Sequence, residues 1–210
     1  MAARALLIDF GGVLTSDVFA AFAAFCEREG LPADAMRDAF RFDEESRRLL
    51  VEHECGRIGA EAFGLALAGR LSELTGVRVS GDGLVERATA ALEPDEEMVA
   101  AVAALHAGGV PTVLVSNTLG DGIYEWCDLD GLFDAVVLSS AVGVRKPSRE
   151  IYRMAVAHAG VEAPECVMVD DLPHNLAGAE RLGIQTLLHR RASETVPALE
   201  TLFGGRSAAP

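Results

Sequence analysis

Four stretches of this chain place chemically active side chains at or just beyond short apolar runs. Asp9 ends RALLID, Ser116 ends PTVLVS, Asp170 and Asp171 end CVMVDD, and Lys146 lies in VRKPS after a further apolar run. A carboxylate can act as a nucleophile or bind a hard cation, and a hydroxyl or an ammonium group can hold an anion. Together these residue types fit phosphoryl transfer, in which an aspartate attacks phosphorus while Mg²⁺ and a lysine neutralise the phosphoryl oxygens.

Each residue also has an ordinary structural interpretation when it is taken alone. Aspartate, serine and threonine commonly cap helices or form turns, and lysine usually lies on the surface. Asp170 and Asp171 give the strongest single signal, because adjacent carboxylates repel one another and favour a bound cation such as Mg²⁺. The alternative is one surface carboxylate and one helix cap. Asn175, four residues after Asp171, can orient that carboxylate.

The apolar runs also indicate the elements that must position these residues. Runs of about five residues, apolar almost throughout, are typical of central strands in a parallel sheet that is covered on both faces. Helical patterns with acidic starts and glycine stops lie between them, as in DEEMVAAVAALHAGG. This alternation predicts an α/β fold, a doubly wound Rossmann-like parallel sheet whose ligands bind at the carboxyl ends of the strands.

The alternation is interrupted after the first strand. Residues 16–92 contain no strand-like run and show helical patterns instead, such as SDVFAAFAAFCEREG with its apolar residues on one face. We therefore predict a helical insertion at residues 16–92, with the α/β core formed by residues 1–15 and 93–210.

The composition limits the classes of function. The 210 residues are 50% hydrophobic and carry a net charge of −14 without a dense basic block, so nucleic-acid binding is not expected. No apolar run approaches the roughly 18 residues of a membrane span, and no signal-peptide pattern is present. The four cysteines form no C-x-x-C pair, which indicates reduced thiols in a cytoplasmic protein. We expect a small-molecule substrate, no nucleic-acid or membrane partner, and a monomer or homodimer.

The four stretches resemble, in order and spacing, the motifs of haloacid dehalogenase-like (HAD) hydrolases. LLIDFGGVLT is similar to the first motif, VLVSNT to the second, VGVRKPSREIY to the third and VMVDDLPHNLAGAERLGI to the fourth. The helical insertion is similar to the family's first-type cap. RKPSREIY and DDLPHN most resemble the subgroup with the phosphatase domain of soluble epoxide hydrolase and bacterial sugar-phosphate phosphatases. CDLDGLFD, residues 127–134, superficially copies the first motif, but it follows IYEW instead of a strand and is expected to be a loop.

The resemblance implies a phosphorylated small-molecule substrate, a Mg²⁺ cofactor and a role for each site residue. Asp9 would form an aspartyl-phosphate, with Ser116 and Lys146 as its catalytic partners. Asp171 would bind Mg²⁺, Asp170 would bind it through water or support the site, and Asn175 would support the site. The residues implied to hold the phosphoryl group are Phe10, Gly11, Ser116, Asn117 and Lys146, and those implied to hold Mg²⁺ are Asp9, Gly11, Asp170 and Asp171.

Gly11 departs from the pattern of the family. Most of its phosphatases carry a second aspartate at this position, which protonates the leaving group and then activates water. The same position binds Mg²⁺ through its backbone carbonyl, so glycine keeps that ligand and loses a proton donor worth about 10²–10⁴ in rate. We expect a slow phosphatase, one that uses good leaving groups, or one whose cap supplies the acid. His53 and Glu54 are the cap residues considered for that role, and the alternative places them on the cap surface.

Three other functions fit parts of the sequence. A 2-haloacid-type dehalogenase of the same fold also lacks the second aspartate, but it works without a metal and would not need the acid pair. A catalytically weak binding protein on the same fold is favoured by one feature of the sequence, Gly11. A phosphonate-cleaving enzyme would need a cap lysine for its Schiff base, and residues 16–92 contain no lysine.

Overall fold

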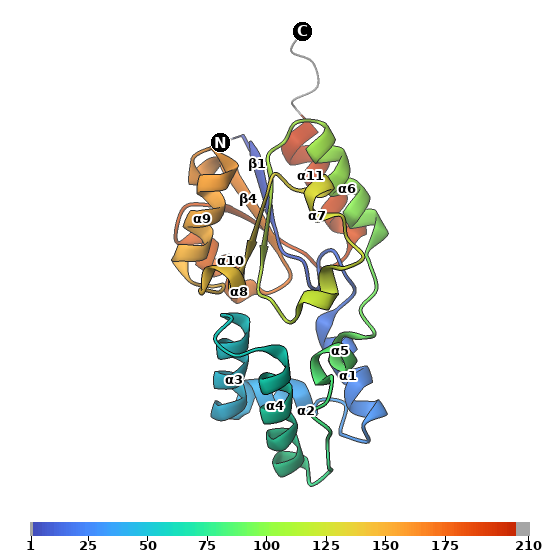
Figure 1. Cartoon of the computed structure of the whole chain (residues 1–210). Coiled ribbons are helices and arrows are strands. Elements are labelled where there is room, and N and C mark those ends of the chain that lie inside the picture. Colours follow the sequence, from blue (N-terminus) through green and yellow to red (C-terminus); the bar gives the residue numbers. More distant parts are fainter. Residues whose placement is uncertain (1, 205–210) are drawn as a thin grey trace.

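The computed structural model, which describes residues 2–204, contains the parallel sheet that the apolar runs predict (Figure 1). Its strands are β1 (Ala5–Ile8), β2 (Thr112–Ser116), β3 (Ala135–Leu138), β4 (Cys166–Asp170) and β5 (Gln185–Leu188), in the order β3-β2-β1-β4-β5. Every residue of β1, β2 and β4 is buried, because helices cover both faces of the sheet. The predicted doubly wound α/β fold is confirmed.

The pairing of the strands determines which strand ends meet. Ile8 of β1 pairs with Leu114 of β2 and with Val169 of β4, and all three strands are parallel. Asp9, one residue beyond β1, therefore emerges between the ends of β2 and β4. This is the edge at which a doubly wound sheet binds its ligands.

Two pairs of helices cover the sheet. Figure 1 shows α9 (Arg149–Ala159) and α10 (Pro173–Glu180) on one face, and α6 (Glu96–Ala107) and α11 (Ala192–Phe203) on the other. Successive side chains of a strand point to opposite faces, so Leu6 packs in the apolar layer of α6 and α11, whereas Leu7 packs in that of α9 and α10. The sheet is therefore held from both sides, which fixes the strand ends that carry the site.

Short helical turns occupy the remaining connections, namely η1 (Asp121–Tyr124), α7 (Leu129–Leu132), α8 (Ser139–Val142) and η2 (Ala163–Glu165). The stretch CDLDGLFD contains α7, so the prediction that it is a loop was wrong. The Asp128 carboxylate starts this helix by accepting a hydrogen bond from the Gly131 N–H at 3.1 Å, which is an ordinary capping contact.

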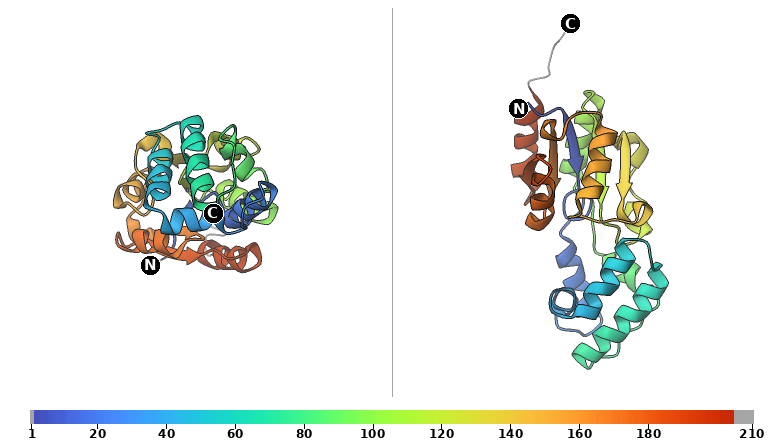
Figure 2. Two further views of the ribbon diagram at one scale, coloured as in Figure 1. Left: turned by 90° about the horizontal axis from the view of Figure 1, so that it is seen from below. Right: turned by 90° about the vertical axis from the view of Figure 1, so that its left-hand side faces the viewer.

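Five helices between β1 and α6 form the insertion, which we call the cap: α1 (Val18–Arg28), α2 (Ala35–Phe42), α3 (Glu44–Glu54), α4 (Ala60–Thr75) and α5 (Leu84–Thr89). The cap has an apolar core of its own, which includes Phe25 and Leu71. Figures 1 and 2 show it beyond the carboxyl ends of the strands. The helical insertion after β1 is confirmed, and the division into a cap at 16–92 and a core of 1–15 and 93–210 stays a prediction.

The cap contacts the core through the end of α3 and the turn after it, residues 53–58, which we call the cap tip. His53 Nε2 lies 2.9 Å from the carbonyl oxygen of Leu119, in the loop after β2. Ser139 Oγ, at the end of β3, donates to the main-chain carbonyl of Glu54 at 2.5 Å. The cap tip is thus joined to the loop after β2 and to the start of α8, at the same edge of the sheet that carries Asp9.

Gly56 of the cap tip lies against the core, and its replacement tests that contact. It has a φ of +70°, and an added Cβ would lie 2.3 Å from the carbonyl oxygen of Ser140. Gly76 is a matched control, because it has a φ of +75° but nothing within 4 Å of an added Cβ.

We expect Gly76→Ala to lower the free energy of unfolding by about 1–2 kcal/mol, through the left-handed backbone alone. Gly56→Ala should lose about 1–3 kcal/mol more, because the cap tip or α8 must move. Urea denaturation measures both values. Equal losses in the two variants would contradict the docking of the cap tip on α8.

Candidate active site

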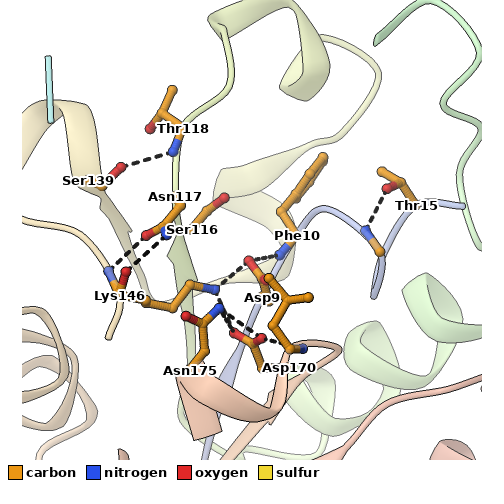
Figure 3. A network of polar contacts seen from close by, with 12 residues as sticks. Asp9, Phe10, Thr15, Ser116, Asn117, Thr118, Ser139, Lys146, Asp170 and Asn175 are labelled. Atoms are coloured by element: carbon orange, nitrogen blue, oxygen red, sulfur yellow. Dashed lines mark hydrogen bonds and ion pairs between the residues drawn. The ribbon is translucent and has the colours of Figure 1, made fainter. Parts of the chain in front are cut away.

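A single buried ammonium group joins two carboxylates at the carboxyl edge of the sheet (Figure 3). Lys146 Nζ lies 2.6 Å from Asp9 Oδ1 and 2.8 Å from Asp170 Oδ2. Lys146 is the only lysine of the sequence, and its side chain is fully buried. Burial alone would lower its pKa, but the two facing carboxylates outweigh burial and raise the pKa of Lys146 above its ordinary value. The lysine therefore stays charged and holds the ends of β1 and β4 together.

Asp9 occupies the place that the sequence predicts, directly at the end of β1. Its Oδ1 accepts hydrogen bonds from the N–H of Phe10 at 2.8 Å and from Lys146. Burial raises the pKa of Asp9 well above its usual range, although the charge of Lys146 lowers it. Asp9 is 6% exposed, so its ionised form depends on the cations around it.

Asn117 fixes the backbone of Lys146 to the end of β2. Asn117 Oδ1 accepts from the Lys146 N–H at 2.8 Å, and Asn117 Nδ2 donates to the Lys146 carbonyl at 3.2 Å (Figure 3). This two-point contact uses both ends of the side-chain amide. Asn117 is therefore a positioning residue for Lys146, while its contact with a phosphoryl group stays a prediction.

Asp170 is buried and accepts from three different residues. Besides Lys146, it accepts from the Leu172 N–H at 2.9 Å and from Asn175 Nδ2 at 3.0 and 3.2 Å. We expected Asn175 to orient Asp171, and this expectation was wrong. Asn175 lies in the first turn of α10, which begins at Pro173, and its amide points back to the strand end.

Asp171 is the least constrained of the three carboxylates. It is half-buried, and burial together with the charge of Asp170 raises its pKa to about 6. Among residues 2–204 no lysine or arginine forms an ion pair with it. A Cβ added to Gly12 would lie 2.6 Å from Asp171 Oδ2, so the glycine leaves open the space beside this oxygen.

The three carboxylates fit a hard divalent cation. Asp9, Asp170 and Asp171 each offer an oxygen, and these oxygens lie within 4.8 Å of one another. Lys146 supplies one positive charge against three carboxylates, and oxygen donors are the ligands that Mg²⁺ prefers. A bound cation would therefore relieve the repulsion that raises the pKa of Asp171.

Ser116 has a partner that the sequence did not indicate. Ser116 Oγ lies 2.8 Å from the phenol oxygen of Tyr124, whose ring packs on Phe10 at 4.6 Å between centroids. Burial raises the pKa of Tyr124 to about 12, so the phenol stays protonated and can hold the serine hydroxyl. Tyr124 lies only eight residues after Ser116 in the sequence. It reaches the serine because η1 turns the chain back, and no periodic pattern in the sequence predicts this short turn.

The structure places both cap-tip residues, His53 and Glu54, inside the molecule. They are 6% and 5% exposed, so the alternative that they lie on the cap surface was wrong. Both ring nitrogens of His53 face main-chain oxygens, at 2.9 Å from Leu119 and 3.3 Å from Ile58. Glu54 Oε2 instead lies 2.6 Å from Arg145 Nε, next to the lysine of the site.

Comparison with known proteins identifies relatives over nearly the whole chain. A family model described as haloacid dehalogenase-like hydrolase matches residues 3–183. Acyl-CoA dehydrogenase family member 10 of Mus musculus is 30% identical over 207 residues, which cover 96% of this chain and 19% of that protein. Bifunctional epoxide hydrolase 2 of Rattus norvegicus is 27% identical over 226 residues, covering 97% of this chain and 39% of that protein. The chain thus spans about a fifth and about two fifths of these relatives.

Solved structures share the fold. A HAD family enzyme from Bacteroides thetaiotaomicron, in complex with magnesium and inorganic phosphate, has a TM-score of 0.65 at 24% identity over 90% of this chain and 94% of that one. L-2-haloacid dehalogenase from Xanthobacter autotrophicus, with chloropropionic acid covalently bound, has a TM-score of 0.67 at 22% identity over 99% of this chain and 85% of that one.

No helix within residues 2–204 is long and apolar enough to cross a membrane.

Removing the charge of Lys146 tests whether the cluster depends on it. Lys146→Met leaves two buried carboxylates facing each other, and breaking a buried pair in this way costs about 3–5 kcal/mol of unfolding free energy. Burial already raises the pKa of Asp9, and without the lysine that pKa rises further in the folded protein. Protonation of Asp9 then relieves the repulsion in acid, and this relief is lost as the pH rises through that raised value.

The loss in Lys146→Met should therefore be larger at about pH 8 than at about pH 5. Arg149→Met, which removes an exposed cation three residues away, is the matched control and should change stability little. Chemical denaturation at both pH values measures the effect. A loss no greater than that of the control, or one independent of pH, would contradict the role given to Lys146.

Proposed function

This chain belongs to the haloacid dehalogenase-like hydrolases, and on that basis we propose that it is a Mg²⁺-dependent phosphatase of small phosphorylated metabolites. The observation that carries the proposal is the cluster of Asp9, Asp170 and Asp171, whose oxygens lie within 4.8 Å of one another around one lysine. The magnesium and phosphate bound by the related Bacteroides thetaiotaomicron enzyme support it.

In this proposal Asp9 is the nucleophile. Lys146 and the Phe10 N–H both hold Oδ1, which fixes the orientation of the carboxylate and leaves the other oxygen for the bond to phosphorus. Attack forms an aspartyl-phosphate and expels the alcohol, and water then hydrolyses the acyl-phosphate. Lys146 neutralises developing charge, since its own charge is secured by Asp9 and Asp170.

The phosphoryl group is held by the other strand ends. Ser116 offers its hydroxyl at the end of β2, and Tyr124 fixes the orientation of that hydroxyl. Asp9 and Asp171, with the main-chain carbonyl of Gly11 and with Asp170 in support, would hold Mg²⁺. When bound, the ion supplies positive charge that neutralises the phosphoryl oxygens.

The space beside the acid cluster fits a small substrate. A cavity of about 450 Å³ is lined by Gly12 and Asp171, and it continues past Thr15 and Asp17 to Arg190. A volume of this size is typical of small-molecule sites.

A metal-independent dehalogenase is the second candidate. The shared fold with L-2-haloacid dehalogenase and the absence of an acid at Gly11 favour it. Asp171 argues against it, because a half-buried carboxylate without a cationic partner is costly unless an ion neutralises it. A binding protein without turnover is the third candidate and rests on Gly11 alone.

Turnover with and without a metal separates the three candidates. We expect hydrolysis of p-nitrophenyl phosphate, acetyl phosphate or a sugar phosphate with Mg²⁺, loss of that activity with EDTA, and none in Asp9→Asn. Asp130→Asn is the control, since Asp130 is an exposed acid in the similar DLDG stretch and should change nothing.

Three results would contradict the proposal. Phosphate hydrolysis that persists unchanged in EDTA would contradict the dependence on Mg²⁺, and chloride release from 2-chloropropionate would favour the dehalogenase. An absence of turnover on every substrate, with Asp9→Asn indistinguishable from the wild type, would favour the binding protein.

A further inference from the structure

An alcohol that leaves phosphorus needs a proton, and the core residues of the proposed site are already committed to other roles. Asp9 is the nucleophile of the proposed function, and Asp170 and Asp171 belong to the acid cluster. Lys146 is paired with two carboxylates, which raise its pKa and hold its proton. Gly11 has no side chain. The donor is therefore sought in another residue, and the cap tip brings a carboxyl group to this edge of the sheet.

Glu54 is a cap carboxyl beside the lysine of the site, whereas Asp17, near Asp171, is occupied as the N-cap of α1. Glu54 is the last residue of α3 and is 5% exposed, and Ser139 fixes its main-chain carbonyl at 2.5 Å. Its Oε2 lies 2.6 Å from Arg145 Nε, and Arg145 directly precedes Lys146. This pair is not aligned for a hydrogen bond, and Oε2 is buried without one in the described structure, so it keeps the capacity to bond a substrate oxygen.

We propose that Glu54 is the general acid and base of this site and that the cap delivers it. The inference rests on the proposed phosphatase function. In the first step Asp9 forms a bond to phosphorus, the phosphorus–oxygen bond to the alcohol breaks, and the Glu54 proton goes to the leaving oxygen. In the second step the Glu54 carboxylate takes a proton from water as that water attacks the aspartyl-phosphate. Phosphate leaves, and Asp9 and protonated Glu54 are restored.

The electrostatic surroundings of Glu54 suit a group that both gives and accepts a proton. Burial raises its pKa to about 7, against the opposing effect of the positive charges of Arg145 and Lys146. These two residues face it from the core, and His53 is its titratable neighbour on α3. Both protonation states are therefore populated near neutral pH, where general acid–base catalysis is most effective. Arg145 stabilises the carboxylate once the proton has left.

The location of Glu54 links proton transfer to cap closure. The acid is near Lys146 only while the cap tip sits on Ser139 and Ser140. An open cap would admit substrate and remove the donor. A closed cap would place the donor at the leaving group and exclude water, which protects the reaction until the alcohol has gone.

Leaving-group dependence distinguishes this role from a structural one. In Glu54→Gln, we expect kcat/KM for an alkyl phosphate such as glycerol phosphate to fall by about 10²–10⁴, because an alkoxide needs a proton. The value for p-nitrophenyl phosphate should fall far less, because its phenolate leaves without one. Glu52→Gln is the matched control, since Glu52 lies one position before His53 on α3 and pairs with Arg57 at the surface.

The pH profile gives a second test. For the wild type, kcat/KM on the alkyl phosphate should fall as the pH rises above about 7, because the donor must be protonated. Glu54→Gln should lack this fall at high pH, and Glu54→Asp, which keeps a carboxyl group, should retain it.

An acid added at Gly11 should rescue Glu54→Gln. A Cβ at Gly11 meets only Val18 Cγ2 at 3.0 Å, so Glu54→Gln with Gly11→Asp should regain alkyl phosphate turnover.

The outcomes separate failure of this inference from failure of the proposed function. If the wild type hydrolyses phosphate esters with Mg²⁺ and Glu54→Gln loses alkyl and aryl turnover equally, Glu54 is structural and the inference is overturned. Unchanged alkyl turnover in Glu54→Gln, with the fold intact by circular dichroism, overturns it as well. If the wild type hydrolyses no phosphate ester, the proposed function falls and the inference falls with it.

Discussion

The site depends on one ammonium group buried between two carboxylates. An unpaired charge in the interior is very costly, so Lys146, Asp9 and Asp170 are stable there only as a set. The set joins the ends of β1 and β4 to the loop after α8, and Asn117 ties that loop to β2. Because Lys146 cannot balance three neighbouring carboxylates, the cluster keeps an excess of negative charge that suits a metal ion and then an anionic substrate.

The core and the cap contribute different chemistry. The core supplies fixed charge and fixed hydrogen bonds from strand ends that packing holds rigidly on both faces of the sheet. The cap supplies Glu54, a carboxyl whose burial depends on contact with Arg145 and Ser139 across the interface. In this proposal Gly11 leaves the first motif without a proton donor, and the cap supplies one through Glu54.

The sequence indicated the parts of the site that follow from sheet geometry. Parallel strands end at one edge, so Asp9, Lys146 and Asp170 could be expected to meet, and the structure places them together. The sequence could not indicate contacts made by irregular segments, such as Tyr124 on Ser116, or the contact of the cap tip with Ser139, 85 residues further along the chain. Asn175 was assigned to the wrong acid, because the direction of a side chain at the start of a helix depends on how that helix leaves the strand. The chemical roles of these residues remain predictions.

We predict a covalent phosphoryl group on Asp9, and chemical trapping of that intermediate tests the proposed mechanism most directly. Protein that is turning over acetyl phosphate with Mg²⁺ would be quenched in acid, reduced with borohydride and digested with trypsin. Cleavage after Arg4 and Arg28 gives a peptide that contains both Asp9 and Asp17, so one spectrum holds the site and its internal control. The account predicts homoserine in place of Asp9 and an unchanged Asp17. An unmodified Asp9 during demonstrable turnover, or reduction at another carboxylate, would contradict it.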